Sequence, residues 1–416
     1  MYPEEVKLVR KPDRMAMPII WVMCFLNYLE RNALPQARFN GLEEDLNIRG
    51  VQHNTAISIL FVGYLLMQIP SNMLMTRTRP SVYLSCCMIT WAAISGATAS
   101  MHDYKGLVAC RFMLGFVEAP FYPGALYLFS IYYTREELAT RISILYTGQV
   151  VSTGCSGLIA AATFSTLYGV RGLTGWRWLF IIVGSVTAFV ALFGFFLLPD
   201  DPTKTHWLTP EERELCVLRI KWDTVGQQAR GSTACSFNNS FPIIIREMGF
   251  QSIMAFVLTA PPYFEAGFLG IPFAWSSGRF NDRTWHMTAG LSLVVVGFAI
   301  SCATTDQAAR YASTFLYAID AYSVGSVILG CVSNTLSQTP EKKAVAYSLV
   351  DVSANMVSIA LTCGLPVQLR YFIGFSAMVG FAVTSIICAW AMRTWVIRLN
   401  NGIHERKNQA TAFYAF

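Results

Sequence analysis

The chain has 416 residues, of which 54% are hydrophobic and 13% are charged, about half the charged share of a soluble domain. This composition, with a mean hydropathy of +0.43, excludes a large soluble core and indicates a polytopic membrane protein. The net charge of +6 comes from loops and tails, and no basic–aromatic pattern suggests a nucleic-acid partner.

Apolar runs long enough to cross a ~30 Å hydrocarbon core as helices recur along the chain. The first six lie at about 15–34, 55–75, 81–101, 106–129, 142–167 and 178–198. After a polar stretch, further runs lie at about 252–275, 287–303, 311–332, 345–365 and 371–396. Residues 235–245 are also apolar but have half the needed length, so the seventh crossing is expected to be truncated.

These runs predict an all-α membrane protein with two six-helix halves. The expected parts are a cytoplasmic tail at 1–14, a first half at 15–198, a cytoplasmic loop at 199–232, a second half at 233–396 and a cytoplasmic tail at 397–416. With twelve crossings, 21 lysines and arginines fall on the cytoplasmic side and nine on the other, which favours cytoplasmic termini. In the loop, Thr209, Pro210 and two glutamates are typical of a helix start, so a short amphipathic helix is expected there.

The fourth run contains an arginine and a carboxylate, Arg111 and Glu118, seven residues apart and therefore on one helix face. Charges at this depth cost about 2.5–3.5 kcal/mol each and must face protein or water. Pro120 and Pro123 each remove a backbone donor, which predicts a bend or a broken segment. The residues alone leave two interpretations open: a site that moves ions or substrate, or a static pair that ties helices together.

Two stripes of polar or small residues mark other crossings. Asp351 and Asn355 belong to a polar stripe at helical spacing that lines a cavity or hydrogen-bonds a neighbouring helix. On the fifth run, small residues four apart predict close helix packing: Gly148, Ser152, Ser156 and Ala160. Glu265, after two prolines on the eighth crossing, is expected to be a buried carboxylate.

Two further places combine polar side chains with apolar surroundings. Asp320 follows Tyr317 by three residues and is another expected buried carboxylate. Asn27, Glu30 and Arg31 lie at the outer end of the first run, where they line a cavity mouth or simply end the helix.

Several motifs of enzymes and metal sites are missing. The sequence has no GxxxxGK[ST] loop, so the chain carries no ATP-hydrolysing P-loop of its own. It also lacks HExxH, GxSxG and paired CxxC motifs; its eleven cysteines are scattered and its five histidines lie outside the apolar runs. We therefore expect no enzyme activity, no metal and no cofactor.

Several segments of the sequence carry a family resemblance: 27–46, 57–74, 111–148 and 175–184, with weaker ones at 237–250, 258–264 and 309–320. In these segments the chain resembles a major facilitator superfamily transporter of the anion:cation symporter group, typified by fungal allantoate permeases. The resemblance implies two six-helix bundles with internal inverted repeats, a site at the membrane midplane and alternating access. It also implies proton-driven uptake of a small organic anion, such as allantoate, nicotinate, biotin or pantothenate, by a monomer in a fungal plasma membrane.

The resemblance also suggests roles for single residues. Arg111 with Arg31 would attract the substrate carboxylate, and Glu118 would carry the proton. Asn27, Asn355 and Tyr317 are further expected substrate-binding residues, and Asp320 and Asp351 further proton-coupling ones. The expected gating loops contain Arg77 and Arg79 in the first half and Asp282 and Arg283 in the second. Alternatives that remain open are efflux of a fungal secondary metabolite and a degenerate protein that does not transport.

Overall fold

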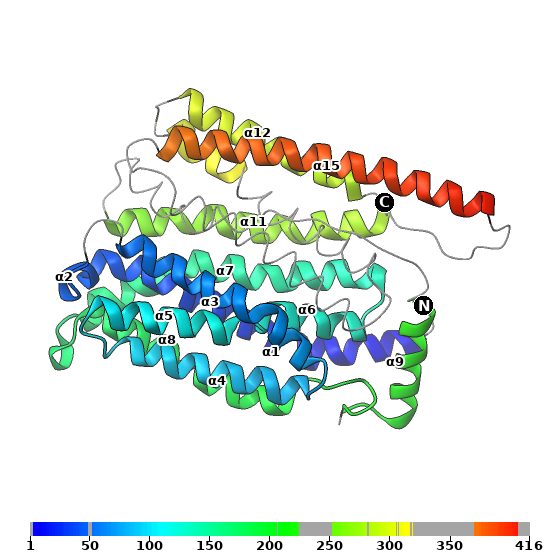
Figure 1. The fold of residues 1–416 in the computed structure, drawn as a ribbon, viewed down its shortest axis with the longest axis horizontal. Coiled ribbons are helices and arrows are strands. Elements are labelled where there is room, and N and C mark those ends of the chain that lie inside the picture. Colours follow the sequence, from blue (N-terminus) through cyan, green and yellow to red (C-terminus); the bar gives the residue numbers. More distant parts are fainter. Residues whose placement is uncertain are drawn as a thin grey trace.

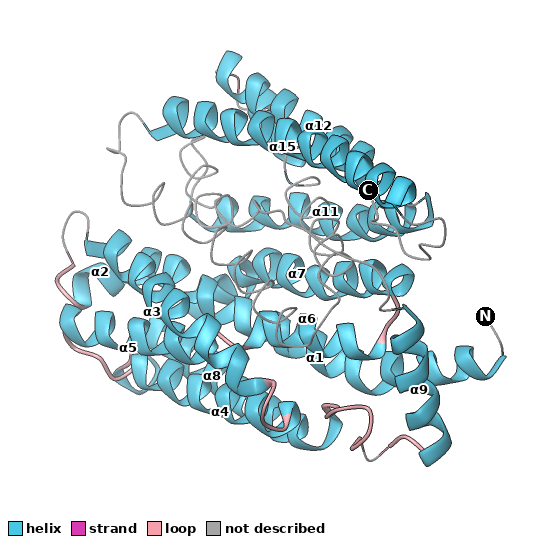
Figure 2. Cartoon of the chain, turned by 45° about the vertical axis from the view of Figure 1, so that its right-hand side comes forward, coloured by secondary structure: helices cyan, strands magenta, loops and turns pink. Residues whose placement is uncertain are grey.

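The structure, a computed structural model, describes residues 3–48, 52–205, 207–223, 252–280, 283–304, 306, 308–316, 318 and 370–406. All elements within these ranges are helices, and most of them run side by side along one direction (Figure 1). Short loops join the helices of the first half at both ends (Figure 2). The predicted all-α architecture is confirmed for the part of the chain that is described.

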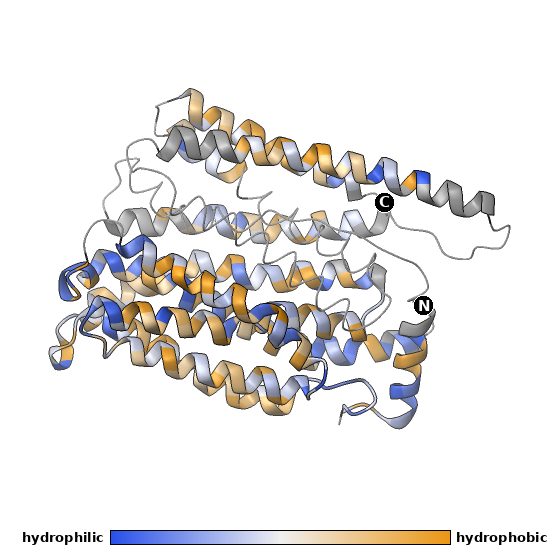
Figure 3. Cartoon of the chain, viewed as in Figure 1, coloured by the Kyte–Doolittle hydropathy of each residue, from blue (hydrophilic) through white to orange (hydrophobic). Residues whose placement is uncertain are grey.

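The first half reproduces the six predicted runs. Its long helices are α1 (Pro3–Ala37), α3 (Gln52–Met75), α4 (Pro80–Thr98), α5 (Tyr104–Glu118), α6 (Phe121–Tyr132), α7 (Arg135–Leu167) and α8 (Gly175–Leu197), and its short elements are η1 (Arg38–Asn40), α2 (Leu42–Asp45) and η2 (Val170–Gly172). Within the described residues, six stretches are long and apolar enough to cross a membrane, five of them in this half. Hydrophilic residues concentrate at the ends of the helices (Figure 3).

The fourth run is broken where the prolines predict it. Helix α5 ends at Glu118 and α6 begins at Phe121, with Ala119 and Pro120 between them. Pro120 and Pro123 have no N–H group, so neither can continue the ladder of helical hydrogen bonds. Nearly all of α6 is buried, which gives the interrupted segment protein rather than lipid as its surroundings.

Helix α7 packs against α1 through small residues of α7 that contact larger polar or aromatic side chains of α1. Trp21 donates its indole N–H to Thr147 at 2.9 Å, and Asn32 donates to Thr153 at 3.2 Å. Gln36 donates to Ser156 at 3.3 Å, and Gly148 lies against the Trp21 backbone. The close packing predicted for the small-residue stripe is therefore confirmed.

The second half is described through α11 (Ser252–Phe280), α12 (Arg283–Ala303) and α15 (Arg370–Arg406). Helix α11 lies beside α7, and α12 lies beside α15 (Figures 1 and 2). Ser143 of α7 donates to the Gly270 carbonyl of α11 at 3.2 Å, and Trp390 of α15 donates to Thr288 of α12 at 3.1 Å. The predicted short crossing at 235–245 and the run at 345–365 lie outside the described residues.

Between the halves, the central loop contains α9 (Pro210–Asp223), as predicted. Its first turn is a reciprocal cap. The Glu212 N–H donates to the Thr209 hydroxyl at 3.3 Å, and the Thr209 N–H donates to the Glu212 carboxylate at 2.9 Å.

Candidate functional site

Four ionisable side chains of α1 and α5 lie inside the first half, with neighbours from α3, α4 and α8. Glu30 and Arg31 come from α1, and Arg111 and Glu118 come from α5. Glu30 and Glu118 are 0% exposed and Arg111 is 1% exposed, while the Arg31 side chain keeps 11% of its surface. Burying charges is strongly unfavourable unless they are paired or hydrogen-bonded, so their partners decide what this group does.

Arg31 and Glu118 form an ion pair that joins the two helices. The Arg31 Nε atom lies 2.7 Å from Glu118 Oε2. The Arg31 guanidinium also lies over the rings of Tyr64 and Tyr28, at 4.4 Å and 5.2 Å from their centroids, which favours its cationic form. The alternative left open by the sequence was a static Arg–Glu pair, involving Arg111 and Glu118, that ties helices together. The structure instead pairs Glu118 with the arginine of α1.

Arg111 has a different environment. Its guanidinium lies 5.2 Å from the centre of the Phe180 ring of α8. Its Nε and Nη2 atoms are buried and have no hydrogen-bond partner among the described residues. Arg111 interacts electrostatically with both carboxyls, Glu118 more strongly than Glu30. Both Glu30 oxygens likewise lack a hydrogen-bond partner among the described residues. Ser95 of α4 and Thr187 of α8 lie beside the Glu30 carboxyl.

The group therefore has unused hydrogen-bonding capacity. Besides Arg111 and Glu30, the buried Asn27 side chain and the Glu118 Oε1 atom make no hydrogen bond of good geometry among the described residues, although Asn27 lies beside the Glu118 carboxyl. Each such group costs about 1–3 kcal/mol when nothing binds it, and charged groups cost more. Groups of this kind are normally satisfied by water or by a ligand. Two guanidinium groups in such a place can bind an anion, and two carboxyls can exchange protons.

The described residues bring together Asn27, Arg31, Arg111 and Glu118 of the predicted site. Glu30 belongs to the same group, although the sequence left it as either a cavity residue or a helix end. In the sequence, its position next to Arg31 could have identified Glu30 as a member of the group. The structure adds that α1 continues past both residues to Ala37, so Glu30 does not end the helix.

Other predicted residues lie elsewhere. Arg77 and Arg79 are exposed in the turn between α3 and α4, and Glu265 is half-buried on α11. Arg283 is the first residue of α12. Outside the described residues lie Asp282, Tyr317, Asp320, Asp351 and Asn355.

One histidine contradicts the sequence-based expectation. His53 was placed outside the apolar cores, yet it lies in the first turn of α3 and is only 2% exposed. Helix α3 begins before the apolar run does. The His53 Nδ1 atom is 3.9 Å from Glu43 of α2, which itself pairs with Arg38 at 2.9 Å.

Comparison with known proteins identifies the architecture. The family described as Major Facilitator Superfamily matches residues 20–362. An uncharacterized transporter of Schizosaccharomyces pombe is 29% identical, over 95% of this chain and 87% of its own length. The MFS-type transporter cnsO of Penicillium expansum is 28% identical, over 95% of this chain and 84% of its own.

A solved structure shows the same fold. The proton:xylose symporter XylE, bound to 6-bromo-6-deoxy-D-glucose, superposes with a TM-score of 0.66 at 10% identity, covering 90% of this chain and 94% of that one. These relatives are membrane transporters and not enzymes. Since the family match extends over most of the sequence, the chain belongs to the major facilitator superfamily of transporters.

Proposed function

We propose that the chain takes up a small organic anion together with protons, by alternating access, at the buried group on α1 and α5. One observation carries the proposal: two arginines and two carboxyls are buried together with unfilled hydrogen-bonding capacity. With all four ionised, Arg31 and Arg111 balance Glu30 and Glu118. An added anion leaves one uncompensated negative charge, which is costly in a low-dielectric interior. A proton on either carboxyl removes that charge, so anion and proton together are accommodated better than either alone.

The contacts suggest an order of events. When Glu118 takes a proton, its charge-assisted bond to Arg31 weakens, and Arg31 becomes available to a substrate carboxylate. Arg111 already has two unpartnered nitrogen atoms, and a planar guanidinium can hold a carboxylate with two parallel hydrogen bonds. Glu30, beside Arg111, is the second carboxyl that can hold a proton. Asn27, beside the Glu118 carboxyl, would contact the polar part of the substrate.

The remaining predicted residues belong to the same proposal. Asn355 and Tyr317 would contribute substrate contacts from the second half, and Asp320 and Asp351 further proton sites. Arg77, Arg79, Asp282 and Arg283 would act in the cytoplasmic gating loops. The resemblance to allantoate permeases supports a monomer in the plasma membrane and allantoate, vitamin or monocarboxylate substrates.

Proteoliposomes with an imposed pH gradient test the proposal. The probes are radiolabelled allantoate, nicotinate, pantothenate and biotin, and uptake of at least one should collapse when an uncoupler is added. Glu118→Gln resembles the protonated carboxyl and cannot ionise, so this variant should exchange substrate but lose pH-driven accumulation. Arg111→Ala should lose transport. Arg111→Lys should recover only part of it, because lysine lacks the planar guanidinium that makes two parallel hydrogen bonds to a carboxylate.

Controls separate these effects from misfolding. Glu44→Gln changes an exposed acid of α2 and should transport like the unmodified protein. All variants are compared at equal amounts of monodisperse protein. Full pH-driven accumulation by Glu118→Gln would refute the coupling role. Equal loss of folded protein in the Glu118 and Arg111 variants would show that the group is structural only.

A further inference from the structure

Helix α9 of the central loop lies against the end of the first half at which α1 and α7 begin (Figure 1). Its Arg219 forms an ion pair with Glu137 at the start of α7, and the two side chains keep only 9% and 10% of their surface exposed. Its Glu212 lies 2.6 Å from the Lys11 ammonium of α1. Arg213 donates to the Thr205 carbonyl, in the segment after α8, at 2.9 Å. The described polar contacts of α9 thus reach several parts of the first half.

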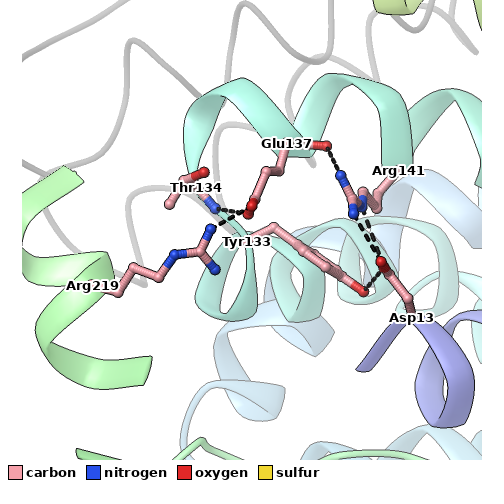
Figure 4. A network of polar contacts seen from close by, with 6 residues as sticks. All are labelled: Asp13, Tyr133, Thr134, Glu137, Arg141 and Arg219. Atoms are coloured by element: carbon pink, nitrogen blue, oxygen red, sulfur yellow. Dashed lines mark hydrogen bonds and ion pairs between the residues drawn. The ribbon is translucent and has the colours of Figure 1, made fainter. Parts of the chain in front are cut away.

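The start of α7 holds α9 and α1 at the same time (Figure 4). Glu137 uses both carboxylate oxygens: Oε2 accepts the Thr134 N–H at 3.2 Å as part of a capping box, and Oε1 accepts Arg219. One turn later, Arg141 donates to Asp13 of α1 at 2.8 Å. The Tyr133 hydroxyl donates to the same carboxylate at 2.7 Å. Glu137 thus links the start of α7 to α9, and Asp13 links it to α1, so the three helices are tied together at a single place.

A native thiol reports on this contact. Cys216 lies three residues before Arg219 and therefore near the same face of α9, and it is 2% exposed. Burial raises the pKa of the Cys216 thiol to about 11, although the nearby Arg219 acts in the opposite direction. A thiol that is both covered and protonated reacts slowly with maleimides, because the thiolate is the nucleophile.

We propose that α9 is a brace that belongs to the first half, fastened by the Glu137–Arg219 ion pair, and that it moves with this half during transport. This inference rests on the proposed alternating-access function. Separating a buried ion pair leaves both charges uncompensated, which is unfavourable. The Glu137–Arg219 pair is therefore expected to stay intact throughout each transport cycle. Loosening the brace should slow turnover and leave the substrate affinity unchanged, because no residue of the contact belongs to the buried group.

The test measures the rate at which a membrane-impermeant maleimide modifies Cys216 in nanodiscs, by peptide mass spectrometry. Glu137→Gln is the sharpest variant, because Gln still accepts the Thr134 N–H in the capping box while the ion pair is lost. Arg219→Gln removes the other partner. Both should raise the Cys216 rate at least about tenfold, since tenfold corresponds to ~1.4 kcal/mol, less than a broken buried pair costs. Glu211→Gln, an exposed acid of the same helix, is the matched control and should leave the rate unchanged.

Two further measurements complete the test. In the unmodified protein, the Cys216 rate measured at one fixed pH should be the same with and without the transported probe anion. In uptake assays, Glu137→Gln and Arg219→Gln should lower the maximal rate severalfold at constant half-saturating concentration. The brace would be refuted if Cys216 were labelled at the same rate in Glu137→Gln and Arg219→Gln as in the unmodified protein. A Cys216 labelling rate that changed when the probe anion was added would refute it as well. Absence of transport for every probe anion would instead count against the proposed function, while the labelling rates would still decide whether α9 is fastened.

Discussion

Helices α3 and α5 touch backbone to backbone at two glycines, and a methyl group there should be poorly tolerated. A Cβ atom added to Gly115 would lie 1.9 Å from the Leu60 carbonyl oxygen, and one added to Gly63 would lie 2.3 Å from the Phe112 carbonyl oxygen. Both obstacles are backbone atoms, which cannot rotate away. Small residues at such positions allow membrane helices to approach closely.

The size of the effect follows from these distances. At Gly115 the methyl group falls about 1.5 Å short of the 3.4 Å at which ordinary contact begins, so α3 and α5 must separate by a similar amount. Overpacking of this kind costs about 1–3 kcal/mol, occasionally more. Helix α5 also carries Glu118, whose bond to Arg31 is 2.7 Å long. A shift of 1.5 Å takes a hydrogen bond of that length beyond its useful range.

The assay compares the thermal stability of purified protein with uptake of the transported probe anion. Gly115→Ala and Gly63→Ala should lower both. Gly96→Ala in α4 is the matched control, because a Cβ at Gly96 would meet nothing within 4 Å. It should be neutral or more stable by up to about 1 kcal/mol, since alanine favours a helix more than glycine does. The packing argument would be refuted if Gly115→Ala were as stable as Gly96→Ala.

Three other outcomes are expected. Asp45→Ala removes the acceptor of the buried Trp176 indole N–H, now 2.8 Å away, and should destabilise the protein by about 1–3 kcal/mol in thermal melts, with Asp45→Asn milder. Thr134→Ala loses part of the α7 capping box and should cost about 1 kcal/mol, which Thr134→Ser should largely restore; an unchanged melting temperature would contradict this. A protease-sensitive tag after Phe416 should resist external protease in intact cells, and cleavage there would contradict the predicted topology.

Local chemistry explains which parts of the fold could be predicted. The break in the fourth crossing follows from two prolines without N–H groups, and the start of α9 follows from Thr209 and the acids after it. Both features depend on residues within one turn of each other. Their position along the chain was therefore clear before any tertiary contact was known.

The site was less predictable because its contacts join distant helices. Helical spacing placed Arg111 and Glu118 on one face, but the partner of Glu118 is Arg31, 87 residues earlier in the chain. Glu30 and Arg31 are neighbours that point about 100° apart, and only the packing of α1 shows that Glu30 is fully buried and that the Arg31 side chain keeps just 11% of its surface. His53 was missed for a similar reason, because α2 and η1 place charged side chains near it.

The interruption at Ala119 and Pro120 also divides the electric dipole of the fourth crossing. Each helix end carries roughly half a unit of charge, negative at the C-terminal end of α5 and positive at the N-terminal end of α6. Glu118 is the last residue of α5, so the Arg31 guanidinium next to it has two negative neighbours, a carboxylate and a helix end. A proton can neutralise the carboxylate but not the helix end. In the proposed mechanism, protonation of Glu118 would therefore weaken the electrostatic attraction on Arg31 without abolishing it, so the helix end would still stabilise the buried guanidinium while it exchanges Glu118 for a substrate carboxylate.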